Sequence, residues 1–420
     1  MFIKRQIFDK IWKEVHSPDI LLLNGPRQSG KTTLLQMIAE KLKTESNVPE
    51  NRLLFFDLEN VDHLNIWSNQ AAAKSVLPLS DNQNKYFVFI DEFQKSKNIG
   101  SILKFIHDHH QNFKFLITGS ASWYLNIDES MAGRKKVFEI WPLSFTEYME
   151  LPKLSEIKKY YQIIAANPDP SLNTLVQSVN QEWINFINFG GYPRVVLSDD
   201  KKEKIEILGE LINSYLLRDI QIWNYAANPL QVKQLLTILA SRIGSLLDIS
   251  SLGANTGMGR SALINRLELL QNTFILFLTR PYFTNKIKEL IKNPKIYLID
   301  NGLRNSFLQN FSLMPQTTDF GMVAENSVIC ELLKNSDSLD QILFWRTKQG
   351  QEIDIVLKRE KQLIPIEIKS GNETAVPSGL KSFINQYNPQ TAYVLNWSEI
   401  KEVNHKGCRI LFRPLWFPIK

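Results

Sequence analysis

The stretch at 25–32, Gly-Pro-Arg-Gln-Ser-Gly-Lys-Thr, constrains this chain more than any other feature. It fits the pattern G-x-x-x-x-G-K-(S/T), follows an apolar run at 20–23 and precedes helix-like spacing at 33–38. Glycines in such a loop let successive backbone N–H groups form a nest for phosphate oxygens, and the helix adds its positive dipole end. We therefore expect a phosphate-binding loop here, and not a chance Gly-Lys-Thr in a surface turn. The residues expected to hold the phosphates are Gly25, Pro26, Arg27, Gln28, Ser29, Gly30, Lys31, Thr32 and Thr33.

A second motif lies at the end of the apolar run at 86–90, where Asp91 and Glu92 follow. In the P-loop pattern the lysine, Lys31, reaches the β- and γ-phosphates, and the hydroxyl of Thr32 binds Mg²⁺. Because parallel sheets bind ligands at the carboxyl ends of their strands, we expect Asp91 to hold the Mg²⁺ shell and Glu92 to orient the attacking water. The sequence thus predicts ATP and Mg²⁺ as cofactors.

Two further candidates follow the acids along the chain. The run at 114–120 predicts a strand between the first two motif strands, so that Thr118 or Ser120 faces the γ-phosphate, unless these residues only end the strand in a turn. Arg134 precedes a strand at 136–140, where a neighbouring subunit's nucleotide would meet a charge-neutralising arginine. A surface arginine that caps a helix remains an equal alternative for Arg134.

The composition is that of a globular protein. Of 420 residues, 44% are hydrophobic and 22% are charged, with a net charge of +6, which permits nucleic-acid binding without requiring it. Two cysteines are too few for a disulfide scaffold, and the six histidines form no ligand cluster. The start lacks a secretory apolar core and no run of about eighteen apolar residues occurs, so we expect a cytoplasmic protein with no membrane partner.

Together these motifs resemble the AAA+-type ATPases of prokaryotic genomes in which an uncharacterised nuclease-like domain follows the ATPase. The resemblance covers nearly the whole chain and implies an ATPase core at 1–143 and a helical lid at 144–228. The segments that carry it, besides the P-loop, are Phe89–Gln94, Ile117–Ser120, Gly133-Arg134, Trp141–Phe145, Gly190–Pro193 and Tyr215–Ile220.

The region 229–290 has the element order of a winged helix-turn-helix. Helical spacing at 232–239, a short helix at 248–252, a glycine turn, a helix from Arg260 and a strand at 274–278 follow in turn. Such a fold inserts the N-terminal residues of its last helix into the major groove, although many winged helices serve only as packing modules. The expected DNA contacts are Arg260, Ser261, Asn265 and Arg266.

The tail, 291–420, combines apolar runs with a spaced set of charges. Strands are expected at 342–346, 352–357 and 363–369, which puts Asp354 and Glu367 on neighbouring strands and Lys369 on the same face as Glu367. Two carboxylates so placed can bind Mg²⁺, with Glu325 from a preceding helix as a further ligand. An exposed acid and a salt-bridged Glu-Lys pair would be the alternative.

This D…E-x-K set resembles the PD-(D/E)xK nuclease superfamily, although Ile353 and not proline precedes Asp354. The fold class expected overall is α/β: a P-loop NTPase parallel sheet with a helical lid, a winged helix-turn-helix and a restriction-endonuclease-like domain. The first functional hypothesis is an ATP-hydrolysing machine that acts on DNA, in which the tail binds or cuts the nucleic acid and which can form a homo-oligomer. A nucleotide-dependent switch with protein partners is the second, and a transporter-linked or purely metabolic P-loop kinase is the third.

Overall fold

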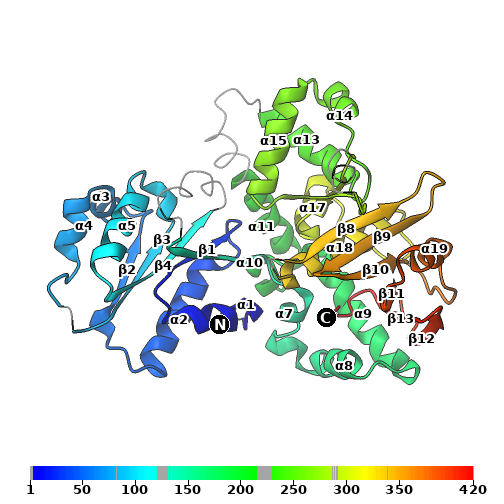
Figure 1. Cartoon of the computed structure of the whole chain (residues 1–420), viewed down its shortest axis with the longest axis horizontal. Helices are drawn as coiled ribbons and strands as arrows, with labels where there is room; N and C mark the ends of the chain where they lie inside the picture. The colour runs from blue at the N-terminus through cyan, green and yellow to red at the C-terminus, as the bar shows by residue number, and fades with distance from the viewer. Residues whose placement is uncertain are drawn as a thin grey trace. The chain divides into compact units, whose positions relative to one another are not determined.

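The computed structural model describes residues 3–419 apart from 82, 121–130, 132, 215–228, 286, 288, 290–291 and 338 (Figure 1). The chain forms two compact units. One comprises Met1–Pro142 with Asn272–Phe274, and the other comprises Leu143–Gln271 with Ile275–Lys420. The motif Tyr215–Ile220 lies outside the described residues. Along the described ranges, no helix has both the length and the apolar character needed to cross a lipid bilayer.

The first unit is built on a five-stranded sheet in the order β2-β3-β4-β1-β5, and all its strands are parallel. All six residues of β1 are buried, as a central strand covered on both faces requires. The predicted place of the 114–120 strand is confirmed, because β4 pairs with both β1 and β3. The strands are β1 (Ile20–Gly25), β2 (Leu53–Asp57), β3 (Tyr86–Asp91), β4 (Phe113–Ser120) and β5 (Lys135–Glu139).

Helices cover both faces of this sheet, and the alternation of side chains along β1 explains why. Leu21 and Leu23 pack into one core with α1 and α2, whereas Ile20 and Leu22 pack into the other core with α3, α4 and α5. The helix expected after the P-loop is present, and a further helix precedes the first strand. The helices are α1 (Gln6–Glu14), α2 (Lys31–Thr44), α3 (Val61–Ser68), α4 (Gln70–Val76) and α5 (Ile99–His109).

The second unit begins with the helices expected for the lid. The Gly190-Gly191 turn ends α9, and the buried carboxylate of Asp300 accepts a hydrogen bond of 2.8 Å from the amide of Gly191. The lid helices therefore share a compact unit, and a buried polar contact, with the C-terminal region. They are α7 (Phe145–Tyr148), α8 (Ser155–Ala166), α9 (Asn173–Phe189), α10 (Pro193–Leu197) and α11 (Lys201–Ser214).

Three helices and a hairpin follow in the order expected of a winged helix. The strand that begins at Lys295 lies within the range expected for the C-terminal domain, but it pairs antiparallel with β6, and Leu246 bridges to Lys295 beside it. A boundary at 290 would therefore cut this hairpin. The elements are α13 (Pro229–Ser241), α14 (Ile249–Thr256), α15 (Arg260–Asn272), β6 (Leu276–Thr279) and β7 (Lys295–Leu298).

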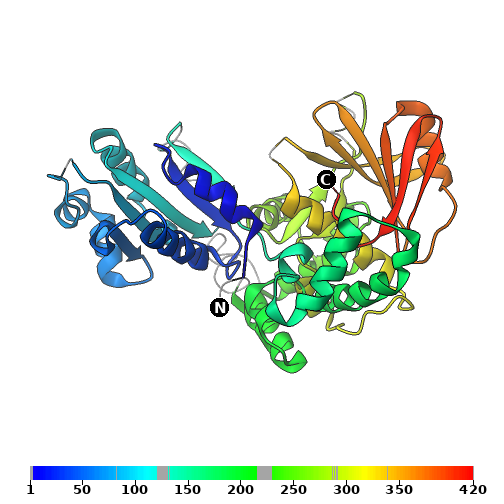
Figure 2. The same cartoon turned by 90° about the horizontal axis from the view of Figure 1, so that it is seen from below.

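The remaining strands form one sheet in the order β12-β13-β11-β10-β9-β8, coloured orange to red in Figure 2. β9 is antiparallel to both of its neighbours, β8 and β10, whereas β11 runs parallel to β10. The three predicted strands of the tail are thus present. The elements are α17 (Asn301–Leu308), α18 (Phe320–Asn335), β8 (Gln341–Arg346), β9 (Glu352–Arg359), β10 (Gln362–Ile368), α19 (Ser378–Tyr387), β11 (Thr391–Asn396), β12 (Lys401–His405) and β13 (Cys408–Pro414).

Candidate functional site

The P-loop joins the end of β1 to the start of α2, as the motif predicts. Gln28 and Gly30 have φ angles of 57° and 94°, in the left-handed region that turns successive amides to one side. At Gly25, a Cβ would lie 2.2 Å from the carbonyl oxygen of Ile140, so only glycine fits there. Thr33 lies in the first turn of α2. The backbone therefore forms the nest at a helix N-terminus that the sequence predicts.

Lys31 lies inside this loop. Its ammonium donates hydrogen bonds to the carbonyl oxygens of Gly25, at 3.0 Å, and Pro26, at 2.8 Å, and the residue is 4% exposed. The hydroxyl oxygen of Ser29 is buried and has no hydrogen-bond partner among the described residues. A buried ammonium and an unsatisfied hydroxyl in a loop of inward amides fit a phosphate group.

Arg5 supports the P-loop through hydrogen bonds to backbone carbonyl groups, a role that the sequence analysis did not predict. Its guanidinium donates to the carbonyl oxygen of Ser29 at 2.9 Å and to that of Trp141 at 2.7 Å, and the residue is buried. The contact joins three segments far apart in the chain, so no local pattern could have indicated it. It also gives a structural role to Trp141 in the 141–145 motif.

Asp91 meets the P-loop across the sheet. Its Oδ2 accepts a hydrogen bond of 2.6 Å from the hydroxyl of Thr32, although the two residues are 59 positions apart. A hydroxyl and a carboxylate oxygen at this separation are the hard oxygen ligands that Mg²⁺ prefers. The residues present therefore fit a Mg²⁺–nucleotide, with Thr32 and Asp91 on the ion and Lys31 on the phosphates.

Glu92 stands directly beside this pair in a strained conformation. Its φ of 52° is uncommon for a residue with a side chain, and such strain is often stored at functional sites. Burial raises the pKa of Glu92 above its ordinary value, while the charges of Lys31 and Arg27 act to lower it. Gln94 donates a hydrogen bond to the Glu92 carboxylate and so orients it, a role that the sequence did not assign.

Thr118 lies beside both acids, and its contact with the γ-phosphate stays a prediction. It is fully buried, donates its hydroxyl hydrogen to Asp91 and accepts a hydrogen bond of 3.2 Å from the amide of Glu92. Its role in this structure is to position both acids, because a single hydroxyl can donate and accept at once. The side chain of Ser120 lies outside the described residues.

Arg134 is not brought to the nucleotide edge of its own domain. Its backbone carbonyl accepts from Ile20 at the amino end of β1, opposite the P-loop. Its guanidinium forms two hydrogen bonds with the carboxylate of Asp108, at 2.6 and 3.0 Å, and this partner raises the pKa of Arg134. A role as an arginine finger for a second copy would require this pair to open.

The four residues predicted to contact DNA divide into two groups on α15. Arg260, Ser261 and Asn265 are exposed. Arg266 is buried and donates to the carbonyl oxygen of Ala262, so its assignment as a DNA contact is wrong. The helical period explains this outcome, because residue 266 falls on the same inward face as Leu263, Leu267 and Leu270.

The acids of the tail come together on β9 and β10. The strands pair Ile355 with Ile366, which places Asp354 and Glu367 side by side on one face. The carboxylate of Asp354 accepts a hydrogen bond of 2.8 Å from the amide of Ile368, and Lys369 donates one of 2.8 Å to Glu367. Burial raises the pKa of Asp354, and it raises that of Glu367 to about 7.

Glu325, on α18, completes this group but is already bonded. It accepts hydrogen bonds from Tyr297 and from Lys295, both on β7, and burial raises its pKa to about 7. Within the part of the chain that the structure describes, no three His, Cys, Asp or Glu side chains are arranged to hold a metal ion. The predicted residues are gathered, but with a lysine among them they do not fit a metal in this arrangement.

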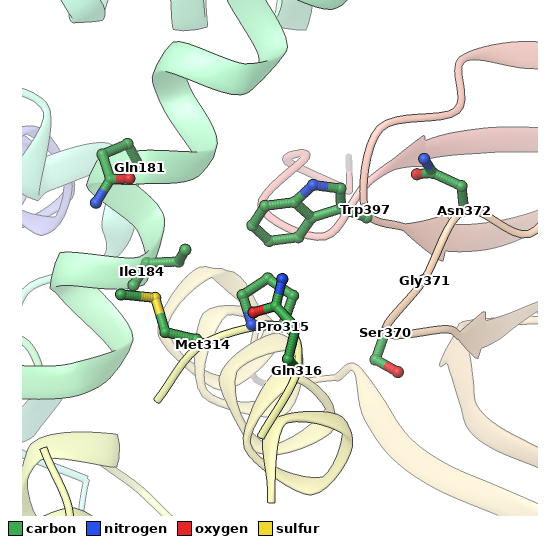
Figure 3. A pocket seen from close by; sticks show the side chains of 9 residues that line it. All are labelled: Gln181, Ile184, Met314, Pro315, Gln316, Ser370, Gly371, Asn372 and Trp397. Carbon is green, nitrogen blue, oxygen red and sulfur yellow. The ribbon is translucent and has the colours of Figure 1, made fainter. Parts of the chain in front are cut away.

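A cavity of about 570 Å³ adjoins this region (Figure 3). It lies between α9, the segment 314–316 that precedes α18, and the segment 370–372 that directly follows Lys369. The indole of Trp397 forms part of its wall, with the amides of Gln181, Gln316 and Asn372. All its lining residues are uncharged, so a ligand there would meet an aromatic ring and amide groups.

Comparison with protein families divides the chain into three matched regions. Residues 17–149 match the family described as AAA domain. Residues 180–313 and 320–411 each match a domain of unknown function, DUF8612 and DUF4143 respectively. The sheet, the P-loop with its paired acids and the first match together define residues 17–149 as an AAA-type P-loop domain.

Relatives in three organisms are all uncharacterized proteins. One from Methanocaldococcus jannaschii is 28% identical over 376 residues, which cover 87% of this chain and 78% of the relative. One from Haemophilus influenzae is 25% identical over 83% of this chain and 82% of the relative. One from Mycobacterium tuberculosis is 23% identical over 90% of this chain and 76% of the relative.

Two solved structures of nucleotide complexes show weaker similarity. The ORC2 protein of Aeropyrum pernix, as ADPNP and ADP complexes, is 13% identical with a TM-score of 0.34, covering 65% of this chain and 84% of that one. AMPPCP-bound DnaA from Aquifex aeolicus is 12% identical with a TM-score of 0.27, covering 63% of this chain and 86% of that one. Scores of this size do not establish a common fold.

Proposed function

We propose that the AAA-type domain binds ATP with Mg²⁺ and hydrolyses it. The observation that carries this proposal is the contact between Thr32 and Asp91, with Glu92 held beside it by Thr118. A hydroxyl, a carboxylate and a second, partly buried carboxylate are the groups that hydrolysis of a triphosphate needs at the end of a P-loop. The match to the AAA domain family supports the same activity.

Each residue has a distinct part in this proposal. The loop amides and Lys31 bind the phosphates, and the ammonium exchanges its contacts with Gly25 and Pro26 for phosphate oxygens. Thr32 and Asp91 hold Mg²⁺, which when bound neutralises charge on the phosphates. The carboxylate of Glu92 orients a water molecule and accepts its proton. Gln94 and Thr118 keep Glu92 and Asp91 in position.

The test is the ATPase rate of the full chain and of three variants. Lys31→Ala should abolish nucleotide binding, whereas Glu92→Gln should retain binding and lose hydrolysis, because the amide cannot accept the proton. Lys43→Ala, at an exposed position on α2, is the matched control and should behave as the unaltered protein. Unchanged rates in Lys31→Ala and Glu92→Gln would refute the assignment.

We further propose that the protein acts on DNA through α15 and the C-terminal region. Arg260, Ser261 and Asn265 are exposed at the N-terminal part of a helix that has the winged-helix position, and the net charge of +6 favours an acidic partner. Arg260→Ala should weaken DNA binding and lower the salt dependence by about one phosphate contact. Lys201→Ala, at an exposed position at the start of α11, is the control.

For the C-terminal domain we propose a nuclease-type fold whose catalytic set would be Asp354, Glu367 and Lys369. Support comes from the pairing of β9 with β10, which puts the two acids side by side, and from the bond between Lys369 and Glu367. Cleavage of linear and branched DNA with Mg²⁺ or Mn²⁺, compared with Asp354→Ala, tests this. Cleavage that survives the substitution would refute the site.

A nucleotide-dependent switch with protein partners is the second candidate. The observation that favours it is the lysine within the acidic group of the tail, since an acidic site filled by a lysine carries out no metal chemistry. Absence of DNA binding at low salt, with ATPase activity intact, would support the switch and contradict the first proposal.

A further inference from the structure

The cavity that adjoins Lys369 has an aromatic side and an apolar side. In Figure 3 the indole of Trp397 lies on one side of it, and the side chains of Ile184 and Met314 lie on the other. Its volume of about 570 Å³ falls within the range of about 300–1,000 Å³ that small-ligand sites occupy. A flat ring that enters between these side chains would stack on the indole and contact apolar groups with its opposite face.

Hydrogen bonds hold Trp397 in place from two directions. Its backbone amide donates to the carbonyl oxygen of Gly371 at 3.0 Å, and its carbonyl oxygen accepts a bond of 2.8 Å from the side chain of Asn180. Asn180 is 1% exposed and in turn accepts a bond of 2.6 Å from the indole of Trp416. The ring of Trp397 packs edge-to-face with Phe320, with centroids 5.8 Å apart. The aromatic side of the cavity is thus preformed, which lowers the entropic cost of binding.

Amide side chains supply the polar part of the lining. Gln181 and Gln316 are exposed, and the amide of each carries two donor hydrogens and an acceptor oxygen. The carbonyl oxygen of Asn372 accepts a hydrogen bond of 2.9 Å from the hydroxyl of Ser398, so its amino group is left to donate. Amides of this kind pair with the edges of nucleobases, which carry matching donors and acceptors. A phosphate or carboxylate, by contrast, would meet no counter-charge in this uncharged lining.

We infer that the cavity binds one unpaired base of a DNA strand, stacked on Trp397 with its edge toward the amides. This inference deepens the proposed action on DNA and rests on it for the choice of ligand. Ser370, which lines the cavity, is joined to Lys369 by one peptide bond, so their Cα atoms lie about 3.8 Å apart. A strand whose base enters the cavity therefore passes beside Lys369. Because a base in a duplex is paired and stacked, the site selects single-stranded or opened DNA.

The first experiment measures binding of a fluorescein-labelled oligothymidine strand to the full chain by anisotropy, without ATP or divalent ions. Trp397→Leu should weaken binding about tenfold, because the stacking face is lost, whereas Trp397→Phe should weaken it by less than about threefold. Gln316→Ala should weaken it about threefold through the lost amide. Gln177→Ala removes an exposed amide of α9 outside the cavity and should leave the affinity unchanged.

Two further DNA ligands separate the base from the rest of the strand. An abasic strand of the same length should bind the unaltered protein and Trp397→Leu equally, because it offers phosphates without a ring. A duplex should also bind both proteins equally, since its bases are paired and α15 is the element proposed to contact it. The response of duplex binding to Arg260→Ala therefore tests the winged-helix proposal separately.

A second measurement needs no variant and so does not depend on how a variant folds. A single strand that carries 5-iodouracil is irradiated in complex with the full chain, and the linked residue is identified by mass spectrometry. The link should form at Trp397 or Met314, on the two sides of the cavity. Links confined to other residues, or equal affinity of the oligothymidine strand for Trp397→Leu and the unaltered protein, would overturn the inference. Neither readout requires cleavage, so a domain that holds the base without cutting the strand would support this inference and refute only the nuclease proposal.

Discussion

Arg5 Nη1 lies 2.9 Å from the carbonyl oxygen of Ser29, so the residue that precedes the first helix is bonded to the middle of the phosphate-binding loop. The same guanidinium also bonds to the carbonyl oxygen of Trp141, beyond the last strand of the sheet. Since a backbone carbonyl near the loop cannot bind phosphate, tying it to an arginine turns the adjacent amides toward the ligand. The loop is thus held in its binding form by a residue outside the motif.

We expect Arg5→Met to weaken nucleotide binding about tenfold and to lower the free energy of unfolding by about 2 kcal/mol, because the carbonyl groups of Ser29 and Trp141 lose their donor. Binding of a fluorescent ADP analogue and chemical denaturation measure the two effects. Lys4→Met, at an exposed neighbouring position, is the control. Equal nucleotide affinity in both variants would show that Arg5 does not support the loop.

The hydroxyl of Thr118 should matter more for hydrolysis than for binding. Thr118→Val removes the donor to Asp91 and the acceptor for the Glu92 amide, so we expect the ATPase rate to fall about tenfold or more with little change in nucleotide affinity. Thr118→Ser keeps the hydroxyl and should retain most of the rate. A loss of affinity without a loss of rate would instead favour contact with the phosphate.

The sequence predicted the first domain well because its elements are specified locally. Apolar runs fixed the strands, and the spacing of glycines fixed the loop around Gly25 and Gly30. The roles of Arg5 and Thr118 could not be predicted, because each depends on segments brought together by the sheet order. The assignment of Arg266 failed for a related reason: whether an isolated basic residue faces solvent or the interior is decided by packing.

The carboxyls of the tail should make stability depend on pH. Burial raises the folded pKa of both Glu325 and Glu367 to about 7, above the ordinary value of 4.5. The folded state then binds more protons than the unfolded state between these values, so stability is greatest below the unfolded pKa and is lost as the pH rises through about 7.

We therefore expect the unfolding temperature of the C-terminal region to fall between about pH 5 and about pH 8, in experiments without divalent ions. Glu367→Gln resembles the protonated acid. Its free energy of unfolding should equal that of the unaltered protein near pH 5 and exceed it by about 1–3 kcal/mol near pH 8. Exposed Glu360→Gln is the control. A stability that rises over this range would contradict the assignment.

Two glycines offer a paired test of the lid. A Cβ on Gly191 would lie 2.2 Å from the carbonyl oxygen of Leu143, whereas one on Gly209, within α11, would meet nothing within 4 Å. Gly191→Ala should destabilise by about 2 kcal/mol or more, because the backbone must shift. Gly209→Ala should stabilise by about 0.5–1 kcal/mol through its helix propensity. Thermal unfolding of both variants measures the contrast, and equal effects would exclude the tight turn.

Asp300 has a consequence for how chains of this kind can be divided or recombined. Its carboxylate bonds to the amide of Gly191 and also to that of Leu303 at the start of α17, 109 and 3 positions away. Removing either segment would take away one of the hydrogen-bond donors of this buried carboxylate. A chimaera that joins halves of two relatives near residue 200 would therefore need both ends of this pairing to match.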